Sequence, residues 1–170
     1  MRNTNCTGVT LIELLIGMAI VAILVTMGLP SFTTWMQNRQ LRSAAESIQT
    51  GLQLARGEAV KRNTFVGFTM AGPDSSWSVD VMNPPQQVQS RSGAEGTPQA
   101  QIATTNSTII FNGLGKTSLA AGAVIQVTNP TGGACKPGGD MNCLNVTVSV
   151  GGQVKMCDPT VVAASDTRGC

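Results

Sequence analysis

An apolar run near the N-terminus limits what this chain can fold into more than any other feature. No residue from Leu14 to Leu29 is charged, and with Leu11 and Ile12 the run approaches the ~20 apolar residues that a helix needs to cross a bilayer. A secretory signal peptide has a basic start, a shorter apolar core and then a small-residue cleavage site. No such site follows this run, so we expect a membrane-spanning helix.

One carboxylate, that of Glu13, lies near the beginning of the run. A charge at the centre of a membrane helix costs ~2.5 to 3.5 kcal/mol, so an acid in such a segment needs a partner. If the chain is cut after Gly8, the new ammonium at Val9 lies four residues before Glu13, about one helical turn away. A position close enough to the interface for the acid to reach lipid headgroups is the alternative. The sequence alone leaves both open.

Gly28 and Pro30 lie together at the end of the apolar run. A proline within a helix removes one hydrogen bond and crowds the preceding turn, which costs ~3 kcal/mol or more unless the helix bends. We therefore expect a kink or local melting here. A simple end of the membrane span is equally compatible with these residues.

Composition weighs against catalysis. The 170 residues include no His, which removes the usual general base at neutral pH and the commonest metal ligand. The carboxylates are scattered without a paired spacing, and no calcium-loop run of Asp and Asn is present. Eleven Lys and Arg against nine Asp and Glu give a net charge of +2. This charge is too small to predict a nucleic-acid partner from the electrostatic field alone. We expect no enzyme, no cofactor and no metal.

The cysteines of the last quarter of the chain predict two disulfides, and hence an oxidising compartment. They are separated by seven, thirteen and twelve residues, whereas zinc-ligand pairs usually lie about two to four residues apart. Three pairings are open, and we rank the two sequential ones first, with each bridge contributing ~2 to 4 kcal/mol. The four residues are Cys135, Cys143, Cys157 and Cys170.

Beyond Pro30 the periodicity becomes that of an amphipathic helix. Apolar residues recur every three or four positions from Leu41 to Ala59, and most polar side chains lie on other faces. We expect the helix to end near Arg62 and Asn63, because cations suit a helix C-terminus and Asn tolerates a left-handed cap.

After Asn63 the sequence is strand-like, and we predict a hairpin and four further strands. Gly151-Gly152 is expected as a two-residue turn between the last two strands. The segment from Asn83 to Ala100, rich in Pro, Gln, Ser and Gly, is predicted as a surface loop. The expected strands are 64–70, 77–82, 107–112, 123–128, 144–150 and 153–157.

These elements predict an α+β fold. A long N-terminal helix, membrane-spanning in its first half and amphipathic in its second, would pack on an antiparallel β-sheet head with C-terminal disulfides.

The residues Gly8-Val9-Thr10-Leu11-Ile12-Glu13-Leu14-Leu15 resemble the processing signal of type IV pilins and type II secretion pseudopilins. The resemblance implies cleavage after Gly8 by a prepilin peptidase and N-methylation of Val9, which stands where the family usually has Phe. It also implies that Glu13 pairs with the methylated N-terminus of an adjacent subunit. In pilins a region corresponding to Gly28 and Pro30 unwinds when the stalk enters the filament.

Later stretches are similar to the FimT/FimU branch of minor pilins, which includes the H-type pseudopilins. Leu41 to Glu46 and Leu52 to Asn63 match the helix signature of that branch, and 109–115 and 148–157 look like its later strands. The resemblance implies a leader at 1–8, an apolar membrane or filament-core segment at 9–35 and a globular head at 36–170.

The function implied is that of a minor pilin. The subunit would span the bacterial inner membrane once with its head in the periplasm, and would then join an extracellular type IV pilus near its tip. There it would support assembly and functions such as twitching, adhesion or DNA uptake. Its partners would be the prepilin peptidase, other minor pilins, the major pilin and the inner-membrane assembly platform. An H-type pseudopilin of a type II secretion system is the alternative.

DNA reception during natural transformation is a third interpretation. Some FimT members use a basic motif close to G-R-x-R, where this chain has Gly152-Gln153-Val154-Lys155 and so lacks one cation. Lys155 and Arg168, with Lys116 and Lys136, would give at most a small, salt-sensitive patch. Few aromatic residues are available to stack on bases. DNA contact at Lys155 and Arg168 is therefore an interpretation that the sequence does not favour.

Overall fold

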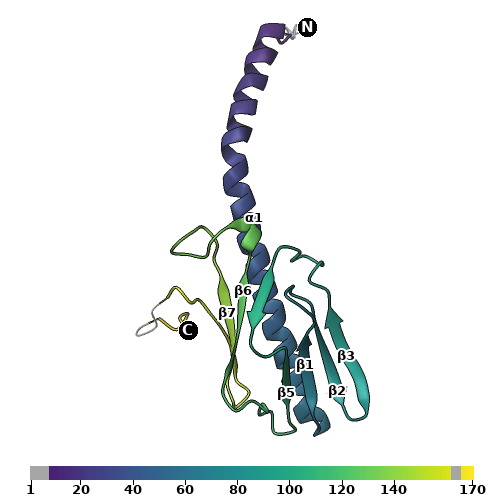
Figure 1. The fold of residues 1–170 in the computed structure, drawn as a ribbon. Coiled ribbons are helices and arrows are strands. Elements are labelled where there is room, and N and C mark those ends of the chain that lie inside the picture. Colours follow the sequence, from purple (N-terminus) through teal and green to yellow (C-terminus); the bar gives the residue numbers. More distant parts are fainter. Residues whose placement is uncertain (1–7, 162–165) are drawn as a thin grey trace, which may run out of the picture. The chain divides into compact units, whose positions relative to one another are not determined.

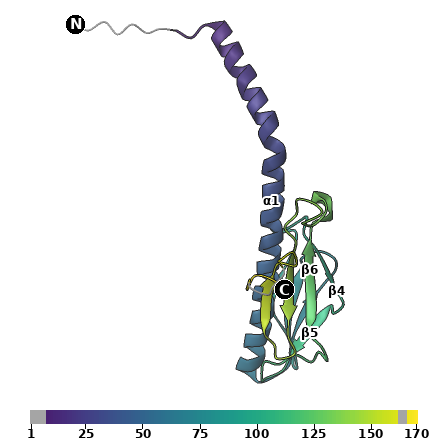
Figure 2. The ribbon, with the colours of Figure 1, turned by 90° about the vertical axis from the view of Figure 1, so that its left-hand side faces the viewer.

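The computed structural model describes residues 8–161 and 166–170, and the chain divides into two compact units, Met1–Trp35 and Met36–Cys170. Helix α1, Leu11–Arg62, begins in the first unit and ends in the second (Figures 1 and 2). We call residues 9–35 the N-terminal segment and residues 36–170 the head. The predicted leader up to Thr7, with Cys6, lies outside the described residues.

Within the head, one face of α1 is buried. Leu41, Ile48 and Leu52 are fully buried, as are alanines at positions 44, 45, 55 and 59. Their spacing of three and four residues places them on a single stripe, which the strands of the head cover. The predicted amphipathic helix is confirmed.

The C-terminal end of α1 follows from its last residues. Asn63 has a φ of 49°, in the left-handed region, and its backbone N–H donates to the carbonyl of Val60 over 3.3 Å. The N–H of Thr64 donates to the carbonyl of Ala59 over 3.2 Å. These two bonds satisfy carbonyls that a helix end leaves free, in the Schellman arrangement. The predicted end at Arg62 and Asn63 is confirmed.

The described residues form eight strands in two antiparallel four-stranded sheets (Figure 1). The first sheet has the order β3-β2-β1-β5, and the second has the order β4-β6-β7-β8. The strands of the first sheet are β1 Val66–Met70, β2 Trp77–Met82, β3 Pro85–Arg91 and β5 Thr108–Phe111. Those of the second are β4 Gln101–Thr104, β6 Ala123–Thr128, β7 Leu144–Val148 and β8 Val154–Cys157. A short 3-10 helix, η1, covers Pro130–Gly132 after β6.

The predicted α+β class is correct, but β4 was not predicted as a strand, and two further local predictions are wrong. The segment from Asn83 to Ala100 is not only loop, because β3 within it pairs with β2 along the edge of the first sheet. The turn between β7 and β8 has three residues, not two. The N–H of Ser149 donates to the carbonyl of Gln153, and Gly152 takes the positive φ of 79° that such a turn requires.

The core lies between α1 and the inward faces of both sheets. Trp77 Nε1 donates to Ser47 Oγ on α1 over 2.8 Å, and its ring centroid lies 5.6 Å from that of Phe68. Gly51 allows this close approach, because a Cβ there would lie 2.6 Å from Phe68 Cε2. The absence of a side chain at Gly51 therefore lets the rings of Phe68 and Trp77 pack against the helix.

Candidate functional site

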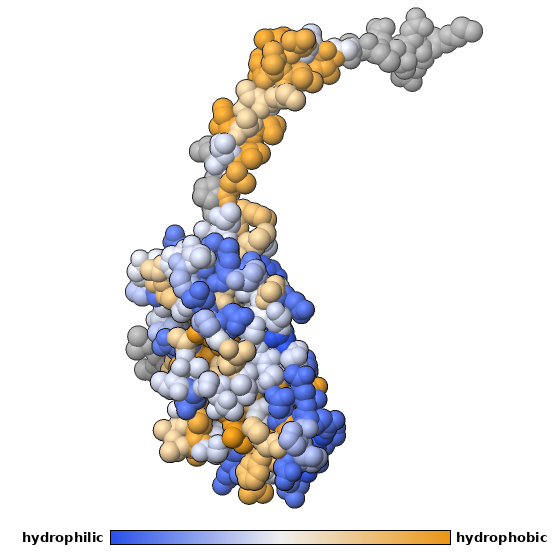
Figure 3. Space-filling model, turned by 45° about the vertical axis from the view of Figure 1, so that its right-hand side comes forward, coloured by the Kyte–Doolittle hydropathy of each residue, from blue (hydrophilic) through white to orange (hydrophobic). Residues whose placement is uncertain are grey.

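The N-terminal segment exposes its apolar side chains. From Val9 to Phe32, the large apolar side chains whose environment is described are 51 to 78% exposed. The same stretch forms an orange surface in Figure 3. Because burying such surface is what drives folding and association, lipid or neighbouring protein has to cover it.

By length and hydropathy, no single helix among the described residues passes as a membrane span. The segments Leu11–Thr26 and Ser31–Arg62, on the two sides of a bend, pass together. Gly28 and Pro30 lie between these segments. The kink that we expect at these residues stays a prediction.

Glu13 lies in the first turn of α1, where its carboxylate caps the helix. Glu13 Oε2 accepts from the backbone N and from Oγ1 of Thr10, each over 3.4 Å. The N–H of Glu13 in turn donates to Thr10 Oγ1 over 3.4 Å. This reciprocal arrangement is a capping box, and the acid also suits the positive end of the helix dipole.

The sequence analysis missed this capping role. The spacing Thr10-Leu11-Ile12-Glu13 fits the [ST]-x-x-E signature, so the signal was present. The capping box places the carboxylate beside the backbone at Thr10, one residue from Val9. Gly8 and Val9 precede the helix, outside any helix or strand, and both are exposed.

Two disulfides close loops in the second half of the head. Cys135 is bonded to Cys143 with a Cα–Cα distance of 5.5 Å, and Cys157 to Cys170 with one of 5.1 Å. This is the sequential pairing that we ranked first. The second bridge ties the end of β8 to the final residue, where the N–H of Asp158 also donates to the carbonyl of Arg168 over 2.7 Å.

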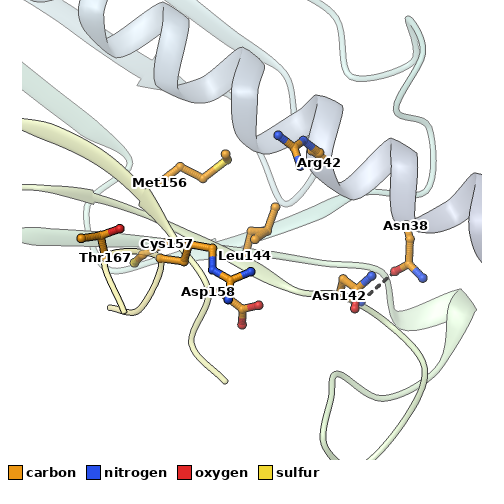
Figure 4. Close-up of a pocket in the computed structure, with 9 residues that line it drawn as sticks. Asn38, Arg42, Asn142, Leu144, Met156, Cys157, Asp158 and Thr167 are labelled. Atoms are coloured by element: carbon orange, nitrogen blue, oxygen red, sulfur yellow. Dashed lines mark hydrogen bonds between the residues drawn. The ribbon is translucent and has the colours of Figure 1, made fainter. Parts of the chain in front are cut away.

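Asn38 fastens the first disulfide loop to α1. Its Oδ1 accepts from the N–H of Asn142 over 2.7 Å, and its Nδ2 donates to the carbonyl of Asp140 over 3.2 Å. Figure 4 shows the first of these bonds beside a groove of about 510 Å³ that Arg42, Leu144 and other side chains line. No residue-by-residue signal in the sequence indicated this clamp.

The two cations proposed for DNA contact lie near each other, and each has a partner within the head. Arg168 is paired with Asp166 over 2.6 Å, and Lys155 Nζ donates to the carbonyl of Gly169 over 2.7 Å. The hydrogen bond from Arg168 is the main cause that lowers the pKa of Asp166 to about 2, and the same bond raises the pKa of Arg168. Arg168 is therefore paired with an acid, whereas Lys155 keeps its charge and bonds a neutral carbonyl.

In the described part of the chain, no three His, Cys, Asp or Glu side chains lie close enough together to hold a metal ion. The groove in Figure 4 is lined by amides, two arginines, one aspartate and apolar groups, without a nucleophile paired to a base.

Two protein-family models match the chain. The model of the family described as Type II transport protein GspH matches residues 44–152, which is more than half of the chain. The chain belongs to the GspH family. A second model, the prokaryotic N-terminal methylation motif, matches residues 3–29 and thus covers Gly8, Val9 and Glu13.

Solved structures agree on the fold of this GspH family member. The type IV minor pilin FimU of Pseudomonas aeruginosa is 16% identical, with a TM-score of 0.58 over 72% of this chain and 91% of that one. The minor pseudopilin EpsH of the Vibrio cholerae type 2 secretion system is 12% identical, with a TM-score of 0.55 over 72% of this chain and 99% of that one. A search among curated proteins found no match.

Family and motif together define the class of molecule. The GspH family member is a minor pilin or pseudopilin, of a type IV pilus or a type II secretion system. It is a structural subunit and not an enzyme.

Proposed function

We propose that this chain is a minor pilin of a type IV pilus, cut between Gly8 and Val9, N-methylated at Val9, and incorporated near the pilus tip to support assembly. The observation that carries the proposal is Glu13, a carboxylate bonded to Thr10 at the start of α1, in the N-terminal segment whose described large apolar side chains are exposed.

The position of Glu13 suits an ion pair between subunits. Thr10 engages only Oε2, and a carboxylate can accept about four hydrogen bonds, so Oε1 can still receive an ammonium. Among apolar helices that ammonium would be the methylated Val9 of an adjacent subunit. An ion pair in such surroundings offsets its desolvation only if both partners are well placed, and removal of one partner costs ~3 to 5 kcal/mol. The pair thus selects a correctly docked neighbour.

The rest of the chain fits this course of events. The exposed segment would wait in the inner membrane and then enter the filament core, with local unwinding at Gly28 and Pro30. The two disulfides favour an oxidising compartment, which supports a periplasmic position of the head before assembly. The partners would be the prepilin peptidase, the assembly platform, other minor pilins and the major pilin.

A pseudopilin of a type II secretion system is the second candidate, because the matching family model is named for type II transport. The two-bridge C-terminal region leads us to favour the pilus. We do not propose DNA reception, because Lys155 and Arg168 are engaged within the head.

The test uses the full chain in its native host. Mass spectrometry of the membrane-extracted protein should report a first residue Val9 that carries one methyl group, together with the two sequential disulfides. Glu13→Gln should be processed normally but should fall at least ~10-fold in sheared pili, given the penalty for an unpaired charge partner. Glu46→Gln, at an exposed acid of the head, is the control and should assemble normally.

Two outcomes would refute the proposal: a mature protein that still begins at Met1, or normal assembly of the Glu13→Gln variant. Co-purification with secretion-system subunits instead of pilins would favour the second candidate.

A further inference from the structure

An open groove lies beside the last turns of α1, between the helix and the turn that joins β7 to β8. Its volume is about 550 Å³, and all of its lining belongs to the head. We call it the Arg56 groove. The side chains that the argument uses are Gln53, Arg56, Val60 and Lys61 of the helix, and Gln153 and Val154 at the start of β8.

The Arg56 side chain lies against two turns that have glycine where they meet it. A Cβ on Gly115 would lie 3.1 Å from Arg56 Nε and 3.5 Å from its Cγ. A Cβ on Gly152 would lie 3.4 Å from the same Nε and would collide with the carbonyl of Gly115. Both glycines have a positive φ, of 73° and 79°. The guanidinium therefore fits here because neither turn carries a side chain at its point of contact.

Hydrogen bonds fix the turns that surround Arg56. Asn112 Oδ1 accepts from the N–H of Leu114 over 3.0 Å, which stabilises the first turn. The N–H of Thr117 donates to the carbonyl of Val150 over 3.1 Å, and this bond joins the first turn to the second. Arg56 thus contacts a preorganised surface, so that little freedom remains to be lost when the groove binds a ligand.

The guanidinium of Arg56 makes no hydrogen bond or ion pair with the described residues of the chain. The nearest acid along α1 is Glu58, but residues two positions apart on a helix do not face each other. Glu58 accepts instead from Lys61 over 3.3 Å and from Arg62 over 2.7 Å. The bond from Arg62 is the main cause that lowers the pKa of Glu58. Arg56 is left for an acceptor from another molecule.

Further donors line the same groove. Gln53 and Gln153 are exposed, and their side-chain amides have no hydrogen-bond partner among the described residues. Lys61 adds an ammonium, and none of the described lining residues is an acid. Amide donors and two cations suit a carboxylate, because a guanidinium presents two N–H groups in a fork that matches the two carboxylate oxygens.

Exposed apolar side chains adjoin these donors. Val60 lines the groove and is 51% exposed, and a Cβ on Gly115 would lie 3.2 Å from its Cγ2. Leu114 is 78% exposed, and Val150 is 45% exposed. The lower end of the head in Figure 3 accordingly shows orange beside blue. A free carboxylate would leave these apolar groups in water, so the acid that fits belongs to a protein surface with apolar side chains around it.

We propose that the Arg56 groove binds an Asp or Glu side chain of a partner protein, while Val60, Leu114 and Val150 pack against apolar residues around that acid. Two copies of this chain placed groove to groove would oppose Arg56 to Arg56, and like charges suppress association. The partner is therefore a different protein. The proposal concerns the head alone and does not rest on the proposed function.

A photo-crosslinking amino acid in place of Leu114 tests the proposal, in the full chain expressed in its native host. Irradiation should give an adduct with another protein, and mass spectrometry should find an Asp or Glu among apolar residues in the crosslinked peptide of the partner. The same amino acid at Val124, which is exposed on β6 outside the groove, is the position control. It should give at least ~10-fold less adduct.

Substitution of Arg56 measures the role of its charge. In the chain with the crosslinker at position 114, Arg56→Gln should lower the adduct at least ~10-fold, because it leaves the acid of the partner without a counter-charge. Arg42→Gln is the matched control on the same helix. Arg42 is paired with Glu46 over 2.8 Å, so its loss should leave the yield unchanged. Both variants should keep the two disulfides, which shows that the head has folded.

A charge swap gives the sharpest measurement. Arg56→Glu should abolish the adduct, and replacement of the partner's acid by Arg should restore it. Absence of this rescue, or equal yields with Arg56→Gln and Arg42→Gln, would overturn the proposal. So would adducts with lipid, with nucleic acid or with a second copy of this chain. Normal assembly of Glu13→Gln would refute the proposed function and leave the groove proposal standing.

Discussion

The N-terminal segment exposes its large apolar side chains, whereas the head buries most of its own. In the segment, Leu15 and its large apolar neighbours are more than half exposed, whereas Phe68, Phe111 and Ile125 of the head are fully buried. The head therefore gains hydrophobic free energy within one chain, and the segment gains it only against lipid or other subunits. Stability and assembly are separate properties of separate regions.

The one ionisable group near the start of the segment fits this division. Glu13 forms hydrogen bonds with Thr10 of the same chain. The apolar side chains of its segment, however, are exposed, and other molecules would have to cover them. The ion pairs of the head, such as Arg62 with Glu58, are completed within the chain. The predictions below test how cleanly the two regions divide these roles.

The largest expected contrast comes from shortening one apolar side chain in each region. Phe68→Ala should lower the free energy of unfolding of the head by about 3 to 5 kcal/mol, because it removes a buried ring and leaves a cavity. Leu15→Ala should change it by less than about 0.5 kcal/mol, since Leu15 contacts solvent in the single chain. Urea unfolding of the detergent-solubilised chain measures both, and equal effects would contradict the division.

Removal of a disulfide should have the next largest effect. Cys157→Ser with Cys170→Ser should cost the head about 2 to 4 kcal/mol, because the unfolded chain regains the freedom of that loop. Differential scanning calorimetry of the double variant should show a lower melting temperature. The comparison is the double variant Cys135→Ser with Cys143→Ser, which removes the first bridge. Asn38 also holds the loop of that bridge, through its hydrogen bonds to Asp140 and Asn142. A loss of membrane insertion would show that the regions are coupled.

Two glycines of α1 should respond with opposite signs. Gly51→Ala should destabilise the head by about 1 to 3 kcal/mol, because the new methyl group would meet Phe68 and Trp77 at 2.6 and 3.1 Å. Gly57→Ala should stabilise it by up to about 1 kcal/mol, since nothing lies within 4 Å and Ala favours helix. Chemical denaturation measures both signs. Stabilisation by Gly51→Ala would show that the aromatic rings do not rest on the helix.

The smallest effect concerns the exposed ion pair of the C-terminal region. The pKa of Asp166 is lowered from 3.8 to about 2 by its bond from Arg168, so the pair favours the folded head above about pH 4. That contribution should disappear as the pH falls through about 2. It should be small, because Arg168 is largely exposed. Asp166→Asn should remove this part of the pH dependence of the melting temperature, and a titration of Asp166 by NMR near its ordinary pKa would contradict it.

The elements with a strong contrast between buried and exposed positions were predictable. The bounds of β2 and β6 match the predicted strands, and both strands alternate buried with less buried residues. β3 was missed because nearly all of its residues are exposed, so it has no alternation, and its hydrogen bonds come from β2. β4 was missed because Ile102 is its one buried residue among four.

The sequence by itself determined the apolar segment, the acid at Glu13, the end of α1 at Asn63 and the family resemblance. Each of these depends on residues that are neighbours along the chain, through hydropathy, capping and motif spacing. Only the tertiary structure decided the division into two sheets and the clamp by which Asn38 holds residues more than a hundred positions away. These features join distant segments, and contacts between distant segments leave no local pattern in a single sequence.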